Sequence, residues 1–228
     1  MISIIIPVLN EETGIVRLLD HLKNNSSFPN NEIIVVDGGS TDKTQELVKE
    51  QSGVVFISSE KGRAKQMNKG VKRATFDVLY FLHADSFPPP NFDRLILNEI
   101  NAGNLAGCFQ MKFDIDHWWL NLMGWFTKFN HKACRGGDQS LFITKTLFSG
   151  LTGFNETFVV YEDNELIGRL YKKKVFKIIP ESITTSARKY EEIGVWKLQF
   201  YFVNIYLKRL MGASPEELHL YYKSRINP

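Results

Sequence analysis

The first half of the chain alternates continuous apolar runs with amphipathic stretches, and these predict strands and helices in turn. Residues 2–8 form a continuous apolar run, which is typical of a strand buried on both faces. The next apolar residues have the i, i+3, i+4, i+7 spacing of a helix: Ile15, Leu18, Leu19 and Leu22. The same pattern repeats, and it predicts strands over 33–36, 54–57 and 78–82 and helices over about 42–51 and 63–74. Strands and helices that alternate in this way favour right-handed crossovers and a parallel sheet.

The second half is less regular and richer in aromatic residues. The spacing of its apolar residues predicts helices over 92–101, 162–172 and 196–211, strands over 107–113 and 175–179, and a last helix opened by a capping box at Ser214. Residues 117–130 also show helical spacing, and their aromatic side chains are interpreted as core. The helix over 196–211 is apolar on both sides, so we expect it to be buried or to meet a partner.

Composition narrows the classes of protein that fit these elements. The 228 residues include 28 Lys or Arg and 25 Asp or Glu, a net charge of +3 that is too even for a protein holding nucleic acid by counterion release. Two cysteines are too few for a disulfide framework or a cysteine-based metal site. The first apolar run has no basic segment before it, and no stretch reaches the roughly 18 apolar residues of a membrane span. We therefore expect a cytoplasmic globular protein of enzymatic size.

Polar residues follow three of the predicted strands at the point where each strand ends. Asn10 and Glu11 follow the first strand, Asp37 the second, and His83 and Asp85 the fourth. Ligands of open parallel sheets bind beyond the carboxyl ends of the strands, so these groups predict a site for a nucleotide base or ribose and a cation. Each Asp is also a common turn former, and that interpretation stays open. The glycine-rich phosphate motifs of dinucleotide-binding and P-loop proteins are absent from the sequence.

Five short motifs, taken in order, resemble the signatures of family 2 glycosyltransferases. Residues 3–11 read SIIIPVLNE, 33–42 read IIVVDGGSTD, 61–70 read KGRAKQMNKG, 83–85 read HAD and 161–166 read YEDNEL. The family patterns that they resemble are S-[IV]-I-I-P-x-x-N-E, V-V-D-D-G-S-T-D, G-x-x-x-A-x-N-x-G, the metal-binding D-x-D and E-D-x-E-L. The resemblance covers roughly residues 2–190, and it is carried by the ordered set, since no single motif is decisive.

The resemblance implies an α/β protein with the GT-A fold, a Rossmann-type αβα sandwich around a mainly parallel central sheet. Residues 1–190 would form this domain, with a nucleotide-sugar half over 1–103 and an acceptor half over 104–190. Residues 191–228 would form a helical extension packed on the same domain. The implied reaction is an inverting single displacement from a nucleoside-diphosphate sugar, by default a UDP-sugar, because this is the commonest donor in the family.

The resemblance also implies roles for individual residues. Asp163 is the candidate general base for the acceptor hydroxyl, with Glu162 as the alternative. A divalent cation, Mn²⁺ or Mg²⁺, would bind Asp85 and His83 and neutralise the charge of the leaving diphosphate. The expected contacts are Pro7, Asn10, Glu11, Asp37, Gly38, Arg63, Ala84, Asp85 and Arg188 on the donor side and Gly137 and Asp138 on the acceptor side.

Two positions depart from the family pattern and keep other functions open. Gly38 stands where the family has the second Asp of D-D-G, and His83 replaces the first carboxylate of D-x-D. Imidazole suits Mn²⁺ better than Mg²⁺. The departures support a non-catalytic nucleotide-sugar-binding or scaffold protein as an alternative, although Asp85 and Asp163 argue against it. A nucleotidyltransferase is a further alternative, but its glycine- and basic-rich loop is absent after the first strand.

Simpler structural roles and several partners also stay open. Asp163 is a favoured type of helix cap, and Arg188 fits an exposed ion pair. Residues 172–174, all lysine, fit either a solvated helix end or a contact with anionic lipid headgroups. The aromatic stretch would also suit a sugar ring or a lipid, and the helix over 196–211 predicts a homodimer or a membrane-surface contact. No residue pattern identifies the acceptor, which is a lipid, a saccharide or a small molecule.

Overall fold

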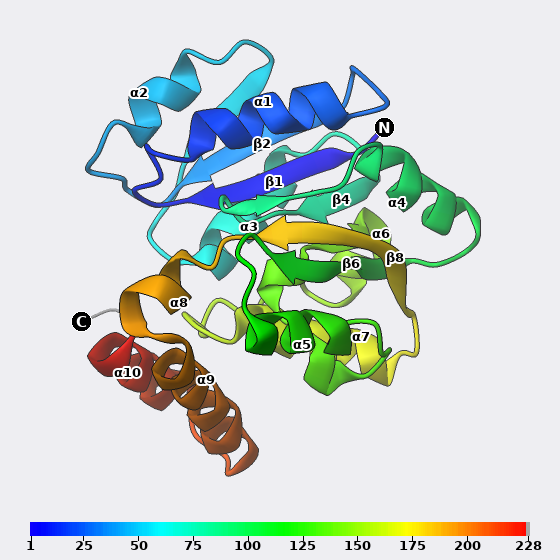
Figure 1. Cartoon of the computed structure of the whole chain (residues 1–228). Helices are drawn as coiled ribbons and strands as arrows, with labels where there is room; N and C mark the ends of the chain where they lie inside the picture. Colours follow the sequence, from blue (N-terminus) through cyan, green and yellow to red (C-terminus); the bar gives the residue numbers. More distant parts are fainter. Residues whose placement is uncertain (227–228) are drawn as a thin grey trace.

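The computed structural model describes residues 1–226, and its centre is one eight-stranded sheet (Figure 1). The strands are β1 (Ser3–Val8), β2 (Glu32–Asp37), β3 (Val54–Ser58), β4 (Val78–Phe81), β5 (Ser86–Phe87), β6 (Ala106–Phe113), β7 (Leu141–Thr144) and β8 (Phe176–Thr185). The helices are α1 (Ile15–Asn25), α2 (Thr44–Lys49), α3 (Arg63–Arg73), α4 (Phe92–Asn101), α5 (Trp118–Phe126), α6 (Lys145–Gly150), α7 (Glu162–Lys172), α8 (Arg188–Ile193), α9 (Val195–Leu210) and α10 (Pro215–Arg225). Two short 3₁₀ turns, η1 (Lys132–Cys134) and η2 (Gly137–Gln139), precede β7.

The sheet is parallel where the sequence alternates strand and helix, and mixed beyond that part. Its strand order is β3-β2-β1-β4-β7-β6-β8-β5. The pairs β3–β2, β2–β1 and β1–β4 are parallel, which confirms the expected α/β class. Strand β7 then runs antiparallel to both β4 and β6, while β6 and β8 are parallel. One continuous sheet therefore joins the two halves of the chain.

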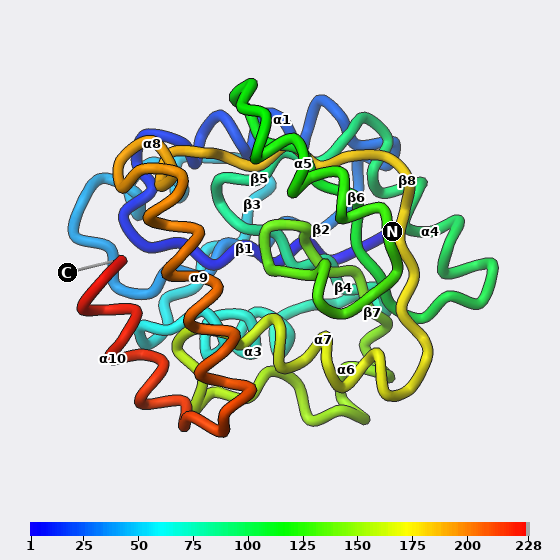
Figure 2. The backbone as a smooth tube through the Cα atoms, turned by 60° about the horizontal axis from the view of Figure 1, so that its bottom comes forward, coloured from blue at the N-terminus to red at the C-terminus, as the bar shows by residue number. Residues whose placement is uncertain are grey.

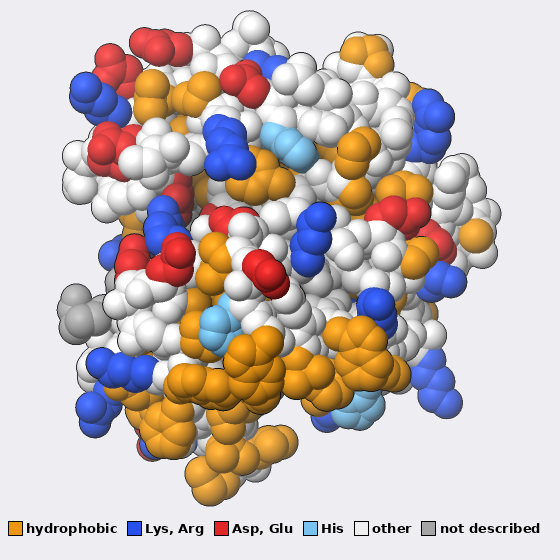
Figure 3. Space-filling model, viewed as in Figure 1, with side chains coloured by type: hydrophobic (Ala, Val, Ile, Leu, Met, Phe, Trp, Pro, Cys, Tyr) orange, Lys and Arg blue, Asp and Glu red, His pale blue; other side chains and the backbone are white. Residues whose placement is uncertain are grey.

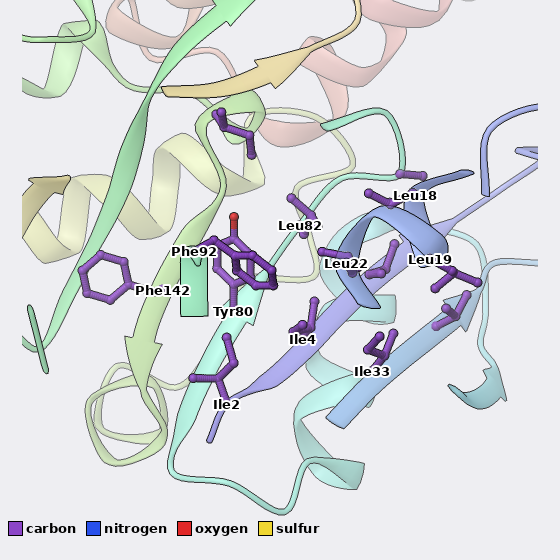
Figure 4. Close-up of a cluster of buried hydrophobic side chains, with 14 of the residues drawn as sticks. Ile2, Ile4, Leu18, Leu19, Leu22, Ile33, Tyr80, Leu82, Phe92 and Phe142 are labelled. Carbon is purple, nitrogen blue, oxygen red and sulfur yellow. The ribbon is translucent and has the colours of Figure 1, made fainter. Parts of the chain in front are cut away.

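Helices cover both faces of the sheet, giving three layers (Figures 1 and 2). Side chains of a strand alternate between its two faces, so Ile4 and Ile6 of β1 pack with α1, α2 and α4, whereas Ile5 packs with α3, α6 and α7. Figure 4 shows the first of these two cores, where Tyr80 stacks on Phe92 of α4. Each such fully buried side chain contributes roughly 1.5–3 kcal/mol of hydrophobic stabilisation.

Three elements of the second half differ from the pattern-based expectation. Strand β7 and helix α6 were not predicted, because the four-residue strand is too short to show a period. The strand expected over 175–179 continues to Thr185, past a bulge at Pro180 and Glu181. The register shows it, because Phe109 pairs with Ile179 and Gln110 pairs with Ser182. Proline lacks the backbone N–H that strand pairing needs, so in a sequence it indicates the end of a strand. In the structure, Pro180 lies in a bulge within β8.

The interpretation of the aromatic stretch as core is wrong. Trp118 and Trp125 of α5 are 63% and 47% exposed, although Leu120 and Gly124 of the same helix are buried. Helix α9 is not buried either, since only Leu198 and Ile205 in it are fully covered. These two side chains belong to a small separate core that α9 shares with α10 and with the segment before α7.

The helices α8, α9 and α10 follow the last strand and lie at the lower left of Figure 1. The expected capping box is present, with Ser214 accepting from the backbone N–H of Glu217 and the Glu217 side chain accepting from that of Ser214. Among residues 1–226, no helix is long and apolar enough to cross a lipid bilayer.

Helix α3 approaches the sheet most closely at Gly70, and this contact yields a test of the fold. A Cβ on Gly70 would lie 2.5 Å from Cγ2 of Ile5, whereas a Cβ on Gly168 of α7 would meet nothing within 4 Å. We expect Gly70→Ala to lower the free energy of unfolding by about 1–3 kcal/mol through overpacking. The matched control Gly168→Ala should instead raise it by up to about 1 kcal/mol, because alanine favours helix. Urea unfolding measures both values, and equal effects of the two substitutions would contradict the packing of α3.

Candidate active site

The loops that follow β1 and β2 are fastened to each other at the carboxyl edge of the sheet. Asn10 adopts a left-handed conformation, with φ 55°, and its backbone N–H donates to Oγ of Ser40. The backbone N–H of Thr41 donates in return to Oδ1 of Asn10, at 2.8 Å. Asn10 therefore holds the predicted donor edge together. Pro7 and Ala84, also predicted there, are both buried.

Asp37 is fully buried, and its carboxylate shapes the turn after β2. It accepts hydrogen bonds from the backbone N–H groups of Gly39 and Ser40 and from the side-chain amide of Gln45. These are the contacts of the turn-forming role that the sequence left open. A direct contact of Asp37 with a nucleotide stays a prediction, and the internal hydrogen bonds do not favour it.

Gln66 of α3 is a buried polar residue beside the predicted donor edge, and sequence reasoning missed it. Its side-chain amide donates to the carbonyl oxygens of Val8 and Val36, which fixes the glutamine beneath the ends of β1 and β2. A Cβ at position 38 would stand 2.9 Å from Oε1 of Gln66. The glycine at position 38 and the buried glutamine therefore belong together, because the space for an Asp side chain is already filled. The sequence signal that could have identified Gln66 was a polar side chain within the KGRAKQMNKG motif.

Glu11, Asp85 and Arg188, which the sequence predicts on the donor side, lie close to one another. A guanidinium nitrogen of Arg188 is 3.5 Å from Oε1 of Glu11, and the backbone N–H of Ser186 donates to the carbonyl oxygen of Asp85. Burial raises the pKa of Glu11, and the negative charge of Asp85 adds to this effect, although Arg188 opposes it. The cluster thus places two carboxylates and one arginine at the carboxyl ends of β1 and β4.

The first turn of α7 carries two adjacent buried carboxylates that have different partners. Nε of Arg63, at the start of α3, is 2.6 Å from Oε1 of Glu162, whose side chain is fully buried. Asp163 instead faces His83, with 3.5 Å between Oδ2 and Nε2. The N-cap of this helix is Tyr161, so Asp163 does not serve as its cap. The helix N-terminus itself favours negative charge at this position.

Asp138 lies on the other side of His83, with 3.5 Å between its Oδ1 and Nδ1 of the imidazole. We call Asp138, His83 and Asp163 the charged row. Burial by itself lowers the pKa of His83, but the contacts with Asp138 and Asp163 outweigh burial and raise the pKa to about 10. The imidazole is therefore a cation at neutral pH. Burial also raises the pKa of Asp163, yet the contact with His83 and the charge of Arg63 hold it below the usual value. Asp163 is thus kept ionised, as a general base must be.

Gly137 lies against Asp163 and His83, at a position where a side chain does not fit. Strand pairing sets this position, since Phe81 of β4 lies opposite Leu141 of β7 and so brings residues 137–139 beside His83. A Cβ on Gly137 would stand 2.1 Å from Oδ2 of Asp163 and 2.6 Å from Cε1 of His83. Any side chain at position 137 would therefore displace the carboxylate or the imidazole.

Arg135 is a second residue to which sequence reasoning assigned no role. It is 2% exposed, and its guanidinium donates to the carbonyl oxygens of Thr127 and Phe129 and to the side chain of Gln139. Arg135 thereby ties the end of α5 to η2, which carries Gly137 and Asp138.

The residues present fit a metal ion that would be held partly by the protein and partly by the phosphates of the nucleotide-sugar substrate. No group of three His, Cys, Asp or Glu side chains within residues 1–226 is placed to hold a metal alone. Mg²⁺ is commonly held by one or two carboxylates together with substrate phosphates, and Asp85 beside Glu11 offers such a set. Both ring nitrogens of His83 face carboxylates, and a protonated imidazole has no lone pair for a metal. The metal role of His83 stays a prediction that this arrangement does not favour.

An open hollow of about 780 Å³ lies beside α2, apart from these groups. Its lining comes from Glu12 and from residues between Ser40 and Lys49. It contains none of the side chains of Asp85, Asp163 or Arg188, so the charged row and this hollow are separate features.

Comparison with known families agrees with the ordered motifs. A family model described as glycosyl transferase family 2 matches residues 3–159, which is more than half of the chain. The chain belongs to this family. The prediction of a glycosyltransferase is therefore confirmed at the level of the family and of the enzyme class. The first four motifs lie inside the matched residues, and the YEDNEL segment follows directly after them.

Two curated relatives each match less than half of the chain. A dolichol-phosphate mannosyltransferase of Pyrococcus furiosus is 32% identical over 108 residues, which are 45% of this chain and 31% of the relative. An uncharacterised glycosyltransferase of Haemophilus influenzae is 35% identical over 97 residues, 38% of this chain and 37% of the relative. The match thus spans about a third of the length of each of these curated relatives.

Solved structures confirm the GT-A fold. The mannosyltransferase PcManGT from Pyrobaculum calidifontis, in complex with GDP-Man and Mn²⁺, superposes with a TM-score of 0.68 at 18% identity and covers 100% of this chain and 70% of its own. S. aureus TarS 1–349 in complex with UDP-GlcNAc gives 0.63 at 18% identity, covering 81% of this chain and 58% of its own. At such identities the likeness concerns the fold alone.

The charged row predicts an unusual histidine titration in this glycosyltransferase. In the metal-free protein, the ring of His83 should stay protonated well above pH 8, because Asp138 and Asp163 raise its pKa. Asp138→Asn removes one of the two negative partners, so it should lower the pKa of His83. Proton–carbon NMR of the imidazole rings measures both values, and the other histidines in the chain serve as internal references. A pKa of His83 near 6.5 in the wild type would contradict the arrangement.

Proposed function

We propose that this glycosyltransferase transfers a sugar, with inversion, from a nucleoside-diphosphate sugar to an acceptor hydroxyl, with Asp163 as general base. The observation that carries the proposal is the ionised, nearly buried carboxylate of Asp163, which lies beside Gly137 at the carboxyl edge of the sheet. Glu162 is less suitable as the base, because it is fully buried and its countercharge is Arg63. The donor would lie between this carboxylate and the cluster of Glu11, Asp85 and Arg188.

The proposed step is a single displacement. Asp163 takes the proton of the acceptor hydroxyl while that oxygen forms its bond to the anomeric carbon. The bond between the anomeric carbon and the diphosphate oxygen breaks, and the electron pair leaves with the nucleoside diphosphate. A divalent ion bound through Asp85 would supply charge neutralisation of that leaving group. Arg188 would contact the diphosphate once its ion pair with Glu11 opens.

The nucleotide is a narrower part of the proposal. UDP is the default nucleotide of the sugar donor in this family. The two structural neighbours were solved with UDP-GlcNAc and with GDP-Man. Gln66 fills the space next to Gly38, and its amide N–H groups are used by the carbonyl oxygens of Val8 and Val36. Base recognition here would therefore not involve a side chain at position 38.

Asp163→Asn tests the assignment of the base. Donor binding is measured as the thermal stabilisation that UDP, GDP, CDP or dTDP confers with Mn²⁺, about 2.7 kcal/mol at a ligand concentration 100 times the Kd. Turnover is measured as release of the nucleoside diphosphate from the matching sugar donor, with water as acceptor. The substitution should leave the stabilisation unchanged and lower turnover by about 10²–10⁴-fold. Asp85→Ala should instead abolish the metal-dependent stabilisation.

Glu165→Gln provides a matched control on the same helix, because Glu165 pairs with Arg169 and faces away from the charged row. It should change neither donor binding nor turnover. Full turnover by Asp163→Asn would overturn the assignment of the base. Nucleotide binding without any turnover in the wild type would favour the scaffold alternative.

A further inference from the structure

The largest group of exposed apolar side chains in residues 1–226 lies on three helices of the second half. Figure 3 shows hydrophobic side chains gathered along the lower edge of the molecule, over α5, α9 and α10. We call this set the aromatic surface, and its members are Trp118, Trp125, Phe126, Phe129, Trp196, Phe200, Val203, Leu207, Leu210, Met211 and Leu220, each at least 40% exposed. Monomeric soluble proteins rarely expose contiguous apolar patches of this kind without a binding role.

The surface is continuous from one helix to the next. The ring of Trp196 on α9 lies 5.7 Å from that of Trp118 and 5.1 Å from that of Trp119, both on α5. The indole N–H of Trp119 also donates to the side chain of Gln199 on α9. At the other end of α5, Trp125 packs edge-on against Phe129, with 4.8 Å between ring centroids. The aromatic side chains therefore hold α5 and α9 side by side with their outer faces uncovered.

Helix α9 presents an apolar stripe along its whole length. Trp196, Phe200, Val203, Leu207 and Leu210 recur at intervals of three or four residues, and all five are at least 44% exposed. Such a stripe normally faces the core, so its exposure indicates a partner outside the chain.

Cations outnumber carboxylates along α5 and α9. Residues 117–137 and 194–213 contain no Asp or Glu, and the cations there that are not buried are Lys128, Lys132, Lys197, Lys208 and Arg209. Asp116 lies one residue before the first range and accepts a hydrogen bond from the side chain of Asn121 on α5. Between α9 and α10 runs a groove of about 540 Å³ that is lined by Trp196, Lys197, Phe200, Tyr201, Tyr221 and Arg225. The groove thus combines an aromatic lining with two cations. The acidic residues of α10, Glu216 and Glu217, are confined to its first turn, and Lys223 and Arg225 occupy its last turn.

We propose that the aromatic surface docks this protein onto an anionic lipid bilayer. Helices that lie in a membrane interface combine tryptophan and phenylalanine with lysine and arginine, because the rings enter the headgroup region and the cations attract anionic lipids. A second copy of the chain fits less well, because a symmetric interface would bring this patch, in which cations outnumber carboxylates, against the same patch of the other copy.

Arg135 connects the aromatic surface to the candidate active site. Its guanidinium joins the carbonyl oxygens of Thr127 and Phe129, at the end of α5, to Gln139 in η2. The bilayer would therefore lie on the acceptor side, next to the segment that carries Gly137 and Asp138. The docking itself does not depend on the proposed sugar transfer, since none of the residues of the aromatic surface belongs to the charged row.

The native tryptophans report directly on this surface. The chain has four, at positions 118, 119, 125 and 196, and all lie on α5 or α9. The full chain is mixed with vesicles of phosphatidylcholine alone or of an equal mixture of phosphatidylcholine and phosphatidylglycerol. We expect flotation with the mixed vesicles and a blue shift of tryptophan emission, with little binding to phosphatidylcholine.

Matched substitutions distinguish docking through the aromatic surface from nonspecific hydrophobic binding. The double variant Trp196→Gln/Phe200→Gln should lower the partition coefficient by about tenfold or more, because it removes two large apolar anchors. Leu105→Gln, another exposed apolar residue, should leave it unchanged. Lys197→Gln should weaken binding to the mixed vesicles, whereas Lys23→Gln on α1 should not. Circular dichroism confirms that each variant is folded.

Three results would overturn the proposal. The first is the absence of wild-type binding to the mixed vesicles. The second is equal binding of the wild type and the double variant. The third is a concentration-dependent dimer, seen by sedimentation, that the double variant abolishes while vesicles bind neither protein; this result would assign the surface to a second copy.

Discussion

Two adjacent buried carboxylates at the start of α7 form the constraint on which the site depends. Removing the partner of a buried charge costs about 3–5 kcal/mol, so Glu162 and Asp163 require cations close by. Arg63 at the start of α3 and His83 after β4 supply them, at 2.6 and 3.5 Å. Both cations come from the first half of the chain and both carboxylates from the second. The same ion pairs therefore link the two halves of the chain and hold Asp163 beside a cation.

The first half of the fold was predictable because its pattern is repetitive. The apolar run of β1 and the spacing of Leu18, Leu19 and Leu22 in α1 correspond directly to buried positions in the structure. Strand β7 was not predictable, because four residues carry no period and its place depends on pairing with β4 over more than sixty intervening residues. The bulge at Pro180 hid the second part of β8 for a local reason, the missing N–H of proline.

The sequence predicted candidate site residues but few of their contacts. The ordered motifs indicated Glu11, Asp85 and Asp163, the family resemblance added Arg188, and the structure brings Glu11 and Arg188 into contact. No pattern could reveal that His83 lies between Asp138 and Asp163, since pairing of β4 with β7 creates that contact. Helical periodicity likewise shows that α9 has an apolar face but does not show whether that face points inward, and here it points to solvent.

The central claim is that the charged row and the cluster around Asp85 are two sides of one donor site. A crystal structure with a non-hydrolysable nucleoside-diphosphate sugar and Mn²⁺ tests it most directly. The account predicts the diphosphate between Asp85 and Arg188 and the anomeric carbon facing Asp163 across Gly137. A donor seated in the hollow beside α2, with Asp163 still closed off by His83, would contradict it.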